Sequence, residues 1–407
     1  MTAGKIINDP VFGFINIPKG LPYDVLTHPI VQRLTRIRQL GLSSFVYPSA
    51  QHTRFQHSVG AFYLMSEAVS NLRAKGVNIS EEEEDAVEAA ILMHDLGHGP
   101  FSHVLEHTLV HDIDHEEISL LLMEKMNEDL GGRLDLAITI FKDQYPKRFL
   151  HQLVSSQLDV DRLDYLRRDS FYTGVIEGNI GSARIIKMLD VHDDHLVVEQ
   201  KGIYSIENFL TARRLMYWQV YLHKTSVASE KMLINTLTRA KELAASGIRL
   251  FSSPALQYFL YNDVSGERFL QDEACLDNFI ELDDNDIWCA LKVWSSHEDM
   301  VLSTLSAGLV RRRLFKVEID ETPFDKTHEK ELTENISQAL GISFDEAAKY
   351  MVVSTTLEKD MYSASDDQIE ILYRDGSTRD IAQASDMFNL SLLAKKVRKY
   401  FLCYCRI

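Results

Sequence analysis

The stretch AAILMHDLGHGPFSH, Ala89–His103, decides how the surrounding chain is to be interpreted. An apolar run typical of a buried helix ends in the adjacent pair His94 and Asp95. Pro100 makes a helical conformation unfavourable at the residue before it, so we predict that this helix ends close to Gly97. Packing alone does not require such a polar pair at a helix end. The pair therefore calls for a chemical explanation.

Histidines gather around this stretch more densely than elsewhere in the chain. Six of the fifteen histidines fall within residues 94–115: His94, His98, His103, His107, His111 and His115. Two further groups of candidate ligands occur at His57, in HTRFQHSVG, and at Asp161, in LDVDRLDYLRRD. Imidazole nitrogens and carboxylate oxygens together suit divalent ions such as zinc, manganese, iron or nickel. We predict a metal site formed by His57, His94, Asp95 and Asp161, with positions left for water and a phosphate oxygen.

Helical periodicity dominates the chain from His28 to about Ala240. Apolar residues at three- and four-residue steps predict a helix over residues 30–40 that ends at Gly41. Ser80 and Glu83 form a capping box before the next apolar run. Other helices are predicted over about 57–73, 115–126, 154–169 and 206–244, with a short hairpin that turns at the glycine of HLVVEQKGIYS.

After Phe315 the pattern changes to short β-like runs around a helix at about residues 331–340. The runs are LFKVEID, KYMVVSTT and QIEILYRDGSTRDI. The predicted fold class is mostly α, with a helical core at residues 1–250 and a smaller helical and α+β C-terminal lobe at residues 251–407. We expect that lobe to serve oligomerisation or regulation.

The composition is that of an ordinary globular protein, with 407 residues of which 45% are hydrophobic and 25% charged. A net charge of −17 argues against nucleic acid as the main partner, because phosphate backbones attract basic surfaces. The four cysteines match neither a zinc finger nor a disulfide framework. The start lacks a signal-peptide profile, and no run of about 18 apolar residues is present. We expect a cytoplasmic protein without a membrane partner.

Five ordered blocks carry a family resemblance. They are KIINDPVFGFI, VQRLTRIRQLG, HTRFQHSVGAFYL, HDLGHGPFSH and LDVDRLDYLRRD. Together with the H…HD…D pattern of His57, His94-Asp95 and Asp161, they resemble the HD superfamily of metal-dependent phosphohydrolases. Within it they are most similar to the deoxynucleoside triphosphate (dNTP) triphosphohydrolases, which include the HD domain of the SAM-and-HD-domain dNTPase and bacterial dGTPase-like enzymes. The resemblance extends over roughly the first 240 residues.

This resemblance implies an HD-domain helical core that hydrolyses dNTPs to nucleoside and tripolyphosphate. It also implies one divalent ion per chain (Mn, Mg, Fe, Zn or Ni) and a homo-oligomer, either a dimer or a tetramer. The implied catalytic residues are His98, His103, His115 and Glu106. The implied substrate-binding residues are Gln39, Leu40, Arg54, Arg162, Tyr165, Asp169, Arg213, Tyr217 and Tyr221. Glu106 departs from the aspartate of the family, and Tyr217 stands where the family often has histidine.

Two other functions are compatible with the same residues. The additional histidines also occur in HD-type phosphodiesterases or nucleotidases with two metals, so His98, His103 or His115 could bind a second ion. A nucleotide-sensing regulatory protein could retain the site without catalysis. Metal stoichiometry and an activity assay separate these hypotheses.

Overall fold

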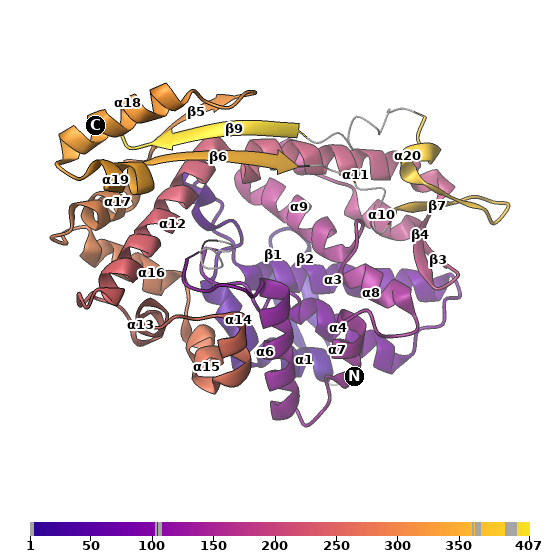
Figure 1. The fold of residues 1–407 in the computed structure, drawn as a ribbon. Helices are drawn as coiled ribbons and strands as arrows, with labels where there is room; N and C mark the ends of the chain where they lie inside the picture. Colours follow the sequence, from indigo (N-terminus) through magenta and orange to yellow (C-terminus); the bar gives the residue numbers. More distant parts are fainter. Residues whose placement is uncertain (1–3, 102–103, 105–107, 360–361, 363–367, 387–396) are drawn as a thin grey trace.

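The computed structural model describes residues 4–101, 104, 108–359, 362, 368–386 and 397–407 of the chain. Most of the described elements are helices, and they form a large helical body that is accompanied by three small sheets within the described residues (Figure 1). The fold class predicted from the sequence is confirmed.

The N-terminal part begins with a hairpin and continues as a helical bundle. Its elements are β1 (Lys5–Asp9), β2 (Gly13–Ile17), α1 (Leu21–Thr27), α2 (Pro29–Gln32), α3 (Arg54–Ala74), α4 (Glu81–Met93), α6 (His115–Asp129), α7 (Asp135–Phe141), α8 (Arg148–Val154), α9 (Val160–Thr173), α10 (Ser182–Met188), β3 (Leu189–His192), β4 (His195–Glu199), α11 (Ile203–Met216) and α12 (Lys224–Ala245). Helix α3 packs against both α4 and α9, so the three segments predicted to carry metal ligands are neighbours in space.

Local capping signals fix the starts of these three segments. Thr53 and Gln56 form a capping box at α3, and Ser80 and Glu83 form the predicted one at α4. The Asp159 side chain accepts a hydrogen bond from the backbone N–H of Arg162 at the start of α9. Each cap satisfies backbone donors that would otherwise lack partners.

The predicted helix over residues 30–40 is wrong beyond Gln32. A 3-10 helix follows α2, and Ile37 is extended, with φ −116° and ψ 120°. The carbonyl of Ile37 accepts from the backbone N–H of Arg54 at 2.9 Å, and the N–H of Gln39 donates to the carbonyl of His52 at 3.0 Å. These bonds to the segment before α3 replace the helical ladder, so the apolar spacing continues although the helix has ended.

Three smaller boundaries also differ from the prediction. Helix α4 ends at Met93, and the helical run predicted over 206–244 is interrupted between α11 and α12. The predicted hairpin is present as β3 and β4, but it turns at Asp193 and Asp194, whose φ angles are 49° and 61°. Aspartate tolerates this left-handed conformation, so a turn without glycine forms there.

The C-terminal part contains helices and the strands predicted after Phe315. Its elements are α13 (Pro254–Tyr261), α14 (Gly266–Gln271), α15 (Glu273–Glu281), α16 (Asp284–Trp294), α17 (Met300–Val310), β5 (Lys316–Asp320), α18 (Lys326–Leu340), α19 (Phe344–Glu346), β6 (Val352–Lys359), β7 (Glu370–Leu372), β8 (Thr378–Asp380), α20 (Ile381–Ala384) and β9 (Val397–Tyr404). Strands β5, β9 and β6 form one antiparallel sheet, while β7 extends the β3–β4 hairpin in a second sheet.

Buried apolar residues from both parts of the chain belong to one continuous core. The division into residues 1–250 and 251–407 stays a prediction.

Within the described ranges, no helix is both long enough and apolar enough to cross a membrane.

One buried carboxyl makes the stability of the core depend on pH. Glu88 of α4 is 4% exposed and accepts a hydrogen bond from the Ser66 hydroxyl of α3. Burial outweighs this bond and raises the pKa of Glu88 from 4.5 to about 7. Its contribution to stability is therefore fully present below about pH 4.5 and is lost as the pH rises through about 7.

Glu88→Gln should remove this dependence. At about pH 8 the variant should be more stable than the parent, by up to about 3 kcal/mol in the free energy of unfolding, and the gain should vanish near pH 4.5. Denaturant unfolding across this range measures the difference, with the exposed Glu124→Gln as a control that shows no such trend. A gain that is the same at every pH would contradict the assignment.

Candidate functional site

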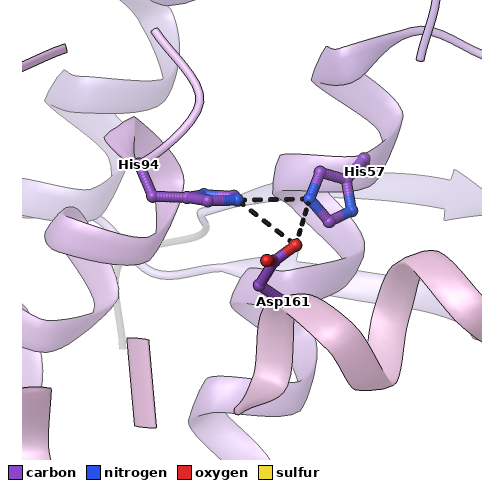
Figure 2. Close-up of side chains that lie close together, drawn as sticks. All are labelled: His57, His94 and Asp161. Carbon is purple, nitrogen blue, oxygen red and sulfur yellow. Dashed lines mark hydrogen bonds and ion pairs between the residues drawn. The ribbon is translucent and has the colours of Figure 1, made fainter. Parts of the chain in front are cut away.

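Three candidate metal ligands converge from three segments (Figure 2). His57 lies on α3, His94 follows α4, and Asp161 lies in the first turn of α9. Nε2 of His57 lies 3.2 Å from Nε2 of His94 and 3.0 Å from Oδ1 of Asp161, and His94 Nε2 lies 3.5 Å from the same oxygen. Adjacent ligands of an ion with bonds of about 2.1 Å are separated by about 3 Å. The donor types and their spacing fit a divalent ion.

Asp95, the fourth predicted ligand, lies at the edge of this group. Its Oδ1 is 3.5 Å from His94 Nε2, and its Oδ2 is 3.8 Å from His57 Nε2. Arg54 donates from Nη1 to Oδ2 of Asp95 at 2.6 Å, so this predicted substrate-binding arginine also contacts a predicted metal ligand. Asp95 remains close enough to complete the predicted set.

The charges of the cluster compensate one another. Burial lowers the pKa of His57, but the hydrogen bonds to Asp161 and Asp164 outweigh it and raise this pKa to about 10. Burial disfavours the charged Asp161 carboxylate, yet its bonds to His57 and His94 hold the pKa well below the usual range. A divalent ion would replace protons held between the imidazoles and carboxylates, as metal binding to histidine requires.

Asp164 orients His57 from the side opposite the metal group. Its Oδ2 lies 2.7 Å from His57 Nδ1. A carboxylate in this position stabilises the proton on Nδ1, so Nε2 would be the nitrogen that binds an ion once its own proton is displaced. Arg168 donates to both oxygens of Asp164 at 2.9 Å and from Nη1 to Asp9 at 2.7 Å. All four side chains are buried. A Cβ at Gly60 would lie 2.0 Å from Asp164 Oδ1, so this arrangement needs glycine at that position.

The turn after α4 carries the first of the predicted catalytic histidines. His98 Nδ1 lies 3.3 Å from Asp95 Oδ1, and its ring lies 4.1 Å from that of His115 at the start of α6. Ser119 Oγ accepts from the Gly97 N–H at 2.8 Å and donates to the carbonyl of His94 at 3.1 Å. A Cβ at Gly97 would meet the carbonyl oxygen of His115 at 1.9 Å. Close contact with α6 therefore brings the two histidines together.

Arg162 and Tyr165 of α9 lie near Asp161, and Arg213 of α11 lies near Tyr165. Tyr165 is close enough to Asp161, Arg162 and Arg213 for all three charges to influence its pKa, although burial is the main reason that this pKa is raised. Nε of Arg162, and Nε and Nη1 of Arg213, are buried without a hydrogen-bond partner among the described residues. Buried N–H groups of this kind are costly unless an anion accepts from them.

Other predicted substrate-binding residues form a second polar group. The two oxygens of Asp169 contact His52 Nε2 at 2.7 Å and the Tyr221 hydroxyl at 2.8 Å. The Tyr221 ring packs edge-on against both Tyr165 and Tyr217. Gln39 has a buried Oε1 without a partner in the described part of the chain. Leu40 is partly buried against the core.

Two predicted catalytic residues, His103 and Glu106, lie outside the described residues. Sequence reasoning missed the roles of His52 and Asp164, since it singled out neither the acceptor of His57 nor the partner of Asp169. The only available signal for Asp164 was its position three residues after Asp161, which places both on related faces of α9. His52 carried no recognisable pattern.

Comparison with protein families agrees with this geometry. The HD domain model matches residues 54–169, which include all four predicted metal ligands, and the HD associated region model matches residues 180–263. The uncharacterized protein YwfO of Bacillus subtilis is 31% identical over 400 residues, which cover 95% of this chain and 88% of that protein.

Proteins named deoxynucleoside triphosphate triphosphohydrolase are also similar. The SAMHD1 homolog of Dictyostelium discoideum is 31% identical over 259 residues, covering 59% of this chain and 50% of that protein. SAMHD1 of Gallus gallus is 30% identical over 282 residues, covering 58% and 45%. The aligned region spans about half the length of these relatives.

Two solved structures share the whole fold. A phosphohydrolase from Bacteroides thetaiotaomicron is 69% identical with a TM-score of 0.96, covering 99% of this chain and 100% of that one. A hypothetical protein from Aquifex aeolicus is 25% identical with a TM-score of 0.72, covering 99% and 96%. The fold and the metal group define an HD-domain phosphohydrolase. This chain belongs to that family and, within it, resembles the dNTP triphosphohydrolases.

Asp164→Asn should weaken metal binding about 10- to 100-fold, because His57 loses the carboxylate that orients it and makes its ring more basic. Equilibrium dialysis with Mn²⁺ measures the affinity, and circular dichroism verifies folding. The exposed Asp345→Asn of α19 removes the same charge and should leave the affinity unchanged. If Asp164→Asn binds Mn²⁺ like the parent, Asp164 does not orient the ligand.

Proposed function

We propose that this protein hydrolyses deoxynucleoside triphosphates to nucleoside and tripolyphosphate. One observation carries the proposal: Arg162 and Arg213 both have buried N–H groups without a hydrogen-bond partner among the described residues. Arg162 Nη1 lies 4.0 Å from Oδ2 of the candidate ligand Asp161, and both arginines lie near Tyr165. Guanidinium groups bind phosphate with directed hydrogen bonds, so the site presents phosphate-binding donors beside a metal position. Similarity to the SAMHD1 proteins of Dictyostelium and chicken supports the same substrate class.

His57, His94, Asp95 and Asp161 would hold the divalent ion. When bound, such an ion polarises a phosphoryl oxygen and lowers the pKa of coordinated water. Among the described residues, only His57, His94 and Asp161 meet as a group of metal ligands, which supports one ion per chain.

Other residues would bind the phosphate and sugar parts of the substrate, according to their positions in the site. Arg162 and Arg213 neutralise phosphate charge, together with Arg54. Tyr165, Tyr217 and Tyr221 form the wall between phosphate and sugar, and Asp169, Gln39 and Leu40 lie on the sugar side. The phosphate and sugar sides are assigned from the family resemblance. The hydrogen bond between Asp169 and Tyr221, and the position of Tyr165 near both arginines, support this assignment.

Water adds to the α-phosphorus while the bond from that phosphorus to the 5′-oxygen breaks. The proton released from water balances the proton that the 5′-oxygen gains as the nucleoside leaves. Imidazole exchanges protons near neutral pH, which suits His98 and His115 to this transfer. The family resemblance assigns a catalytic role to His103 and Glu106 as well. The rings of His98 and His115 lie 4.1 Å apart, and this closeness supports a shared role.

Incubation of the protein with each dNTP and NTP plus Mn²⁺, followed by separation of the products, tests the reaction. Nucleoside and tripolyphosphate are expected from dNTPs, and Asp161→Ala should abolish turnover because one ligand is lost. Monophosphate and pyrophosphate would contradict the proposal. A protein that binds dNTPs without turnover would instead be a nucleotide-sensing regulator.

Arg213→Gln should raise KM for dNTPs about 10- to 100-fold, because a charged hydrogen bond to phosphate is worth about 1.5–3 kcal/mol. Steady-state kinetics measure the change. The exposed Arg184→Gln of α10 removes the same charge and should leave KM within about twofold of the parent. Equal effects of the two variants would show that only overall charge matters.

The two-metal phosphodiesterase is the second candidate, because His98 lies within 3.3 Å of Asp95 and could share an ion with it. Two tightly held ions per chain, of which one is lost in His98→Ala, would favour that reaction.

For the C-terminal lobe, residues 251–407, the proposal includes a role in oligomerisation or regulation of a homo-oligomer. Light scattering with and without dNTPs tests this role.

A further inference from the structure

The turn that carries His98 is also held from the side opposite α6. Arg33, in the 3-10 helix after α2, is 1% exposed and has its guanidinium between two distant segments. Its Nη1 donates to the carbonyls of Leu96 at 3.2 Å and His98 at 3.0 Å. Its Nε donates to the carbonyl of Leu282 at 3.1 Å. Arg33 therefore ties the backbone on both sides of Gly97 to the segment just before α16.

Asp284, the first residue of α16, makes a parallel connection. It is 2% exposed, and its Oδ1 accepts from the Phe101 N–H at 3.1 Å while its Oδ2 accepts from the Arg38 N–H at 3.0 Å. Phe101 has a φ of 57°, a conformation that bulky residues rarely adopt. Its ring packs edge-on against Trp288 of α16 at 5.9 Å. These contacts compensate the strain in the backbone at Phe101.

We propose that Arg33 and Asp284 are positioning residues, which fix the turn from Leu96 to Phe101 so that His98 faces the metal group. Among the described residues, their hydrogen bonds reach neither a metal ligand nor a predicted substrate residue, so they would act through the backbone on either side of His98. The inference rests on the proposed function in one respect, namely that His98 takes part in the reaction. It adds that residues 282–288, far along the sequence, are part of what makes the site active.

Directed hydrogen bonds explain why these residue types are required. Arginine offers five N–H donors in a fixed plane, so one side chain can reach carbonyls in two segments, which a lysine ammonium cannot do with the same geometry. Burial lowers the pKa of Arg33 to about 9 and raises that of Asp284 to about 6. Both groups are therefore held in the interior at a cost in free energy, which a purely apolar contact would avoid.

Arg33→Lys and Asp284→Asn test the proposal, with Arg36→Lys as the matched control. Arg36 lies in the same 3-10 helix and pairs with Asp283 at 2.5 Å, so it joins the same two segments without touching the His98 turn. For each variant, kcat and KM, Mn²⁺ affinity and the melting temperature are measured with the full-length protein.

Arg33→Lys and Asp284→Asn should each lower kcat about 10- to 100-fold, because a misplacement of about 1 Å has an effect of this size. KM and Mn²⁺ affinity should stay within about threefold of the parent, and Arg36→Lys should keep its kcat within about twofold. Asp284→Asn loses a buried charge, so it should remain folded even if Arg33→Lys does not.

A loss of kcat that only follows the unfolded fraction, or equal losses in Arg36→Lys, would overturn the proposal. If Asp284→Asn has the same kcat as the parent, the positioning proposal is also overturned. If the parent releases no tripolyphosphate from any dNTP, the proposed function fails. The positioning proposal is then tested with bis(p-nitrophenyl) phosphate as the substrate, so the two failures are distinguishable.

Discussion

The close approach of α9 to α3 at Gly60 is the constraint on which the metal site depends. Any larger residue there would place its Cβ 2.0 Å from atoms of Asp164 and Arg168. With glycine, the buried ion pair of Asp164 and Arg168 fits between the helices and receives His57 Nδ1 at 2.7 Å. Because His57 and Asp161 lie on these two helices, the same contact sets the distance between two of the three ligands. The packing of α3 against α9 and the spacing of the two ligands are therefore determined by the same contact.

The identities of the candidate ligands could be predicted from sequence, whereas the residues that support them could not. Ion chemistry restricts ligands to a few side-chain types, so His57, His94 and Asp161 stand out in the sequence. Arg33 donates to backbone carbonyls. Every residue type has a backbone carbonyl, so the sequence does not indicate which residues are its partners. The contact of Asp164 with His57 depends in the same way on how α9 packs.

Element boundaries show the same division between local and distant causes. The capping box of Ser80 and Glu83 is a local interaction, and α4 begins where it predicts. The end of α2 is decided by hydrogen bonds from residues 37–39 to residues 52–54, which periodicity cannot reveal. The predicted helix over 30–40 therefore has the correct apolar spacing and the wrong length. The same distant bonds bring Gln39 beside His52, which contacts Asp169.

The overall charge of the chain bears on how a polyanionic substrate would be recognised. A net charge of −17 repels phosphates at long range, but salt screens exposed charges beyond about 8 Å at physiological ionic strength. Recognition must then come from short-range contacts, and the buried N–H groups of Arg162 and Arg213 are of this kind. Within the part of the chain that the structure describes they have no partner, and a phosphate that accepts from them would satisfy these donors. The acidic surface and the arginine-lined site are therefore compatible, because affinity depends on the few donors inside and not on the field outside.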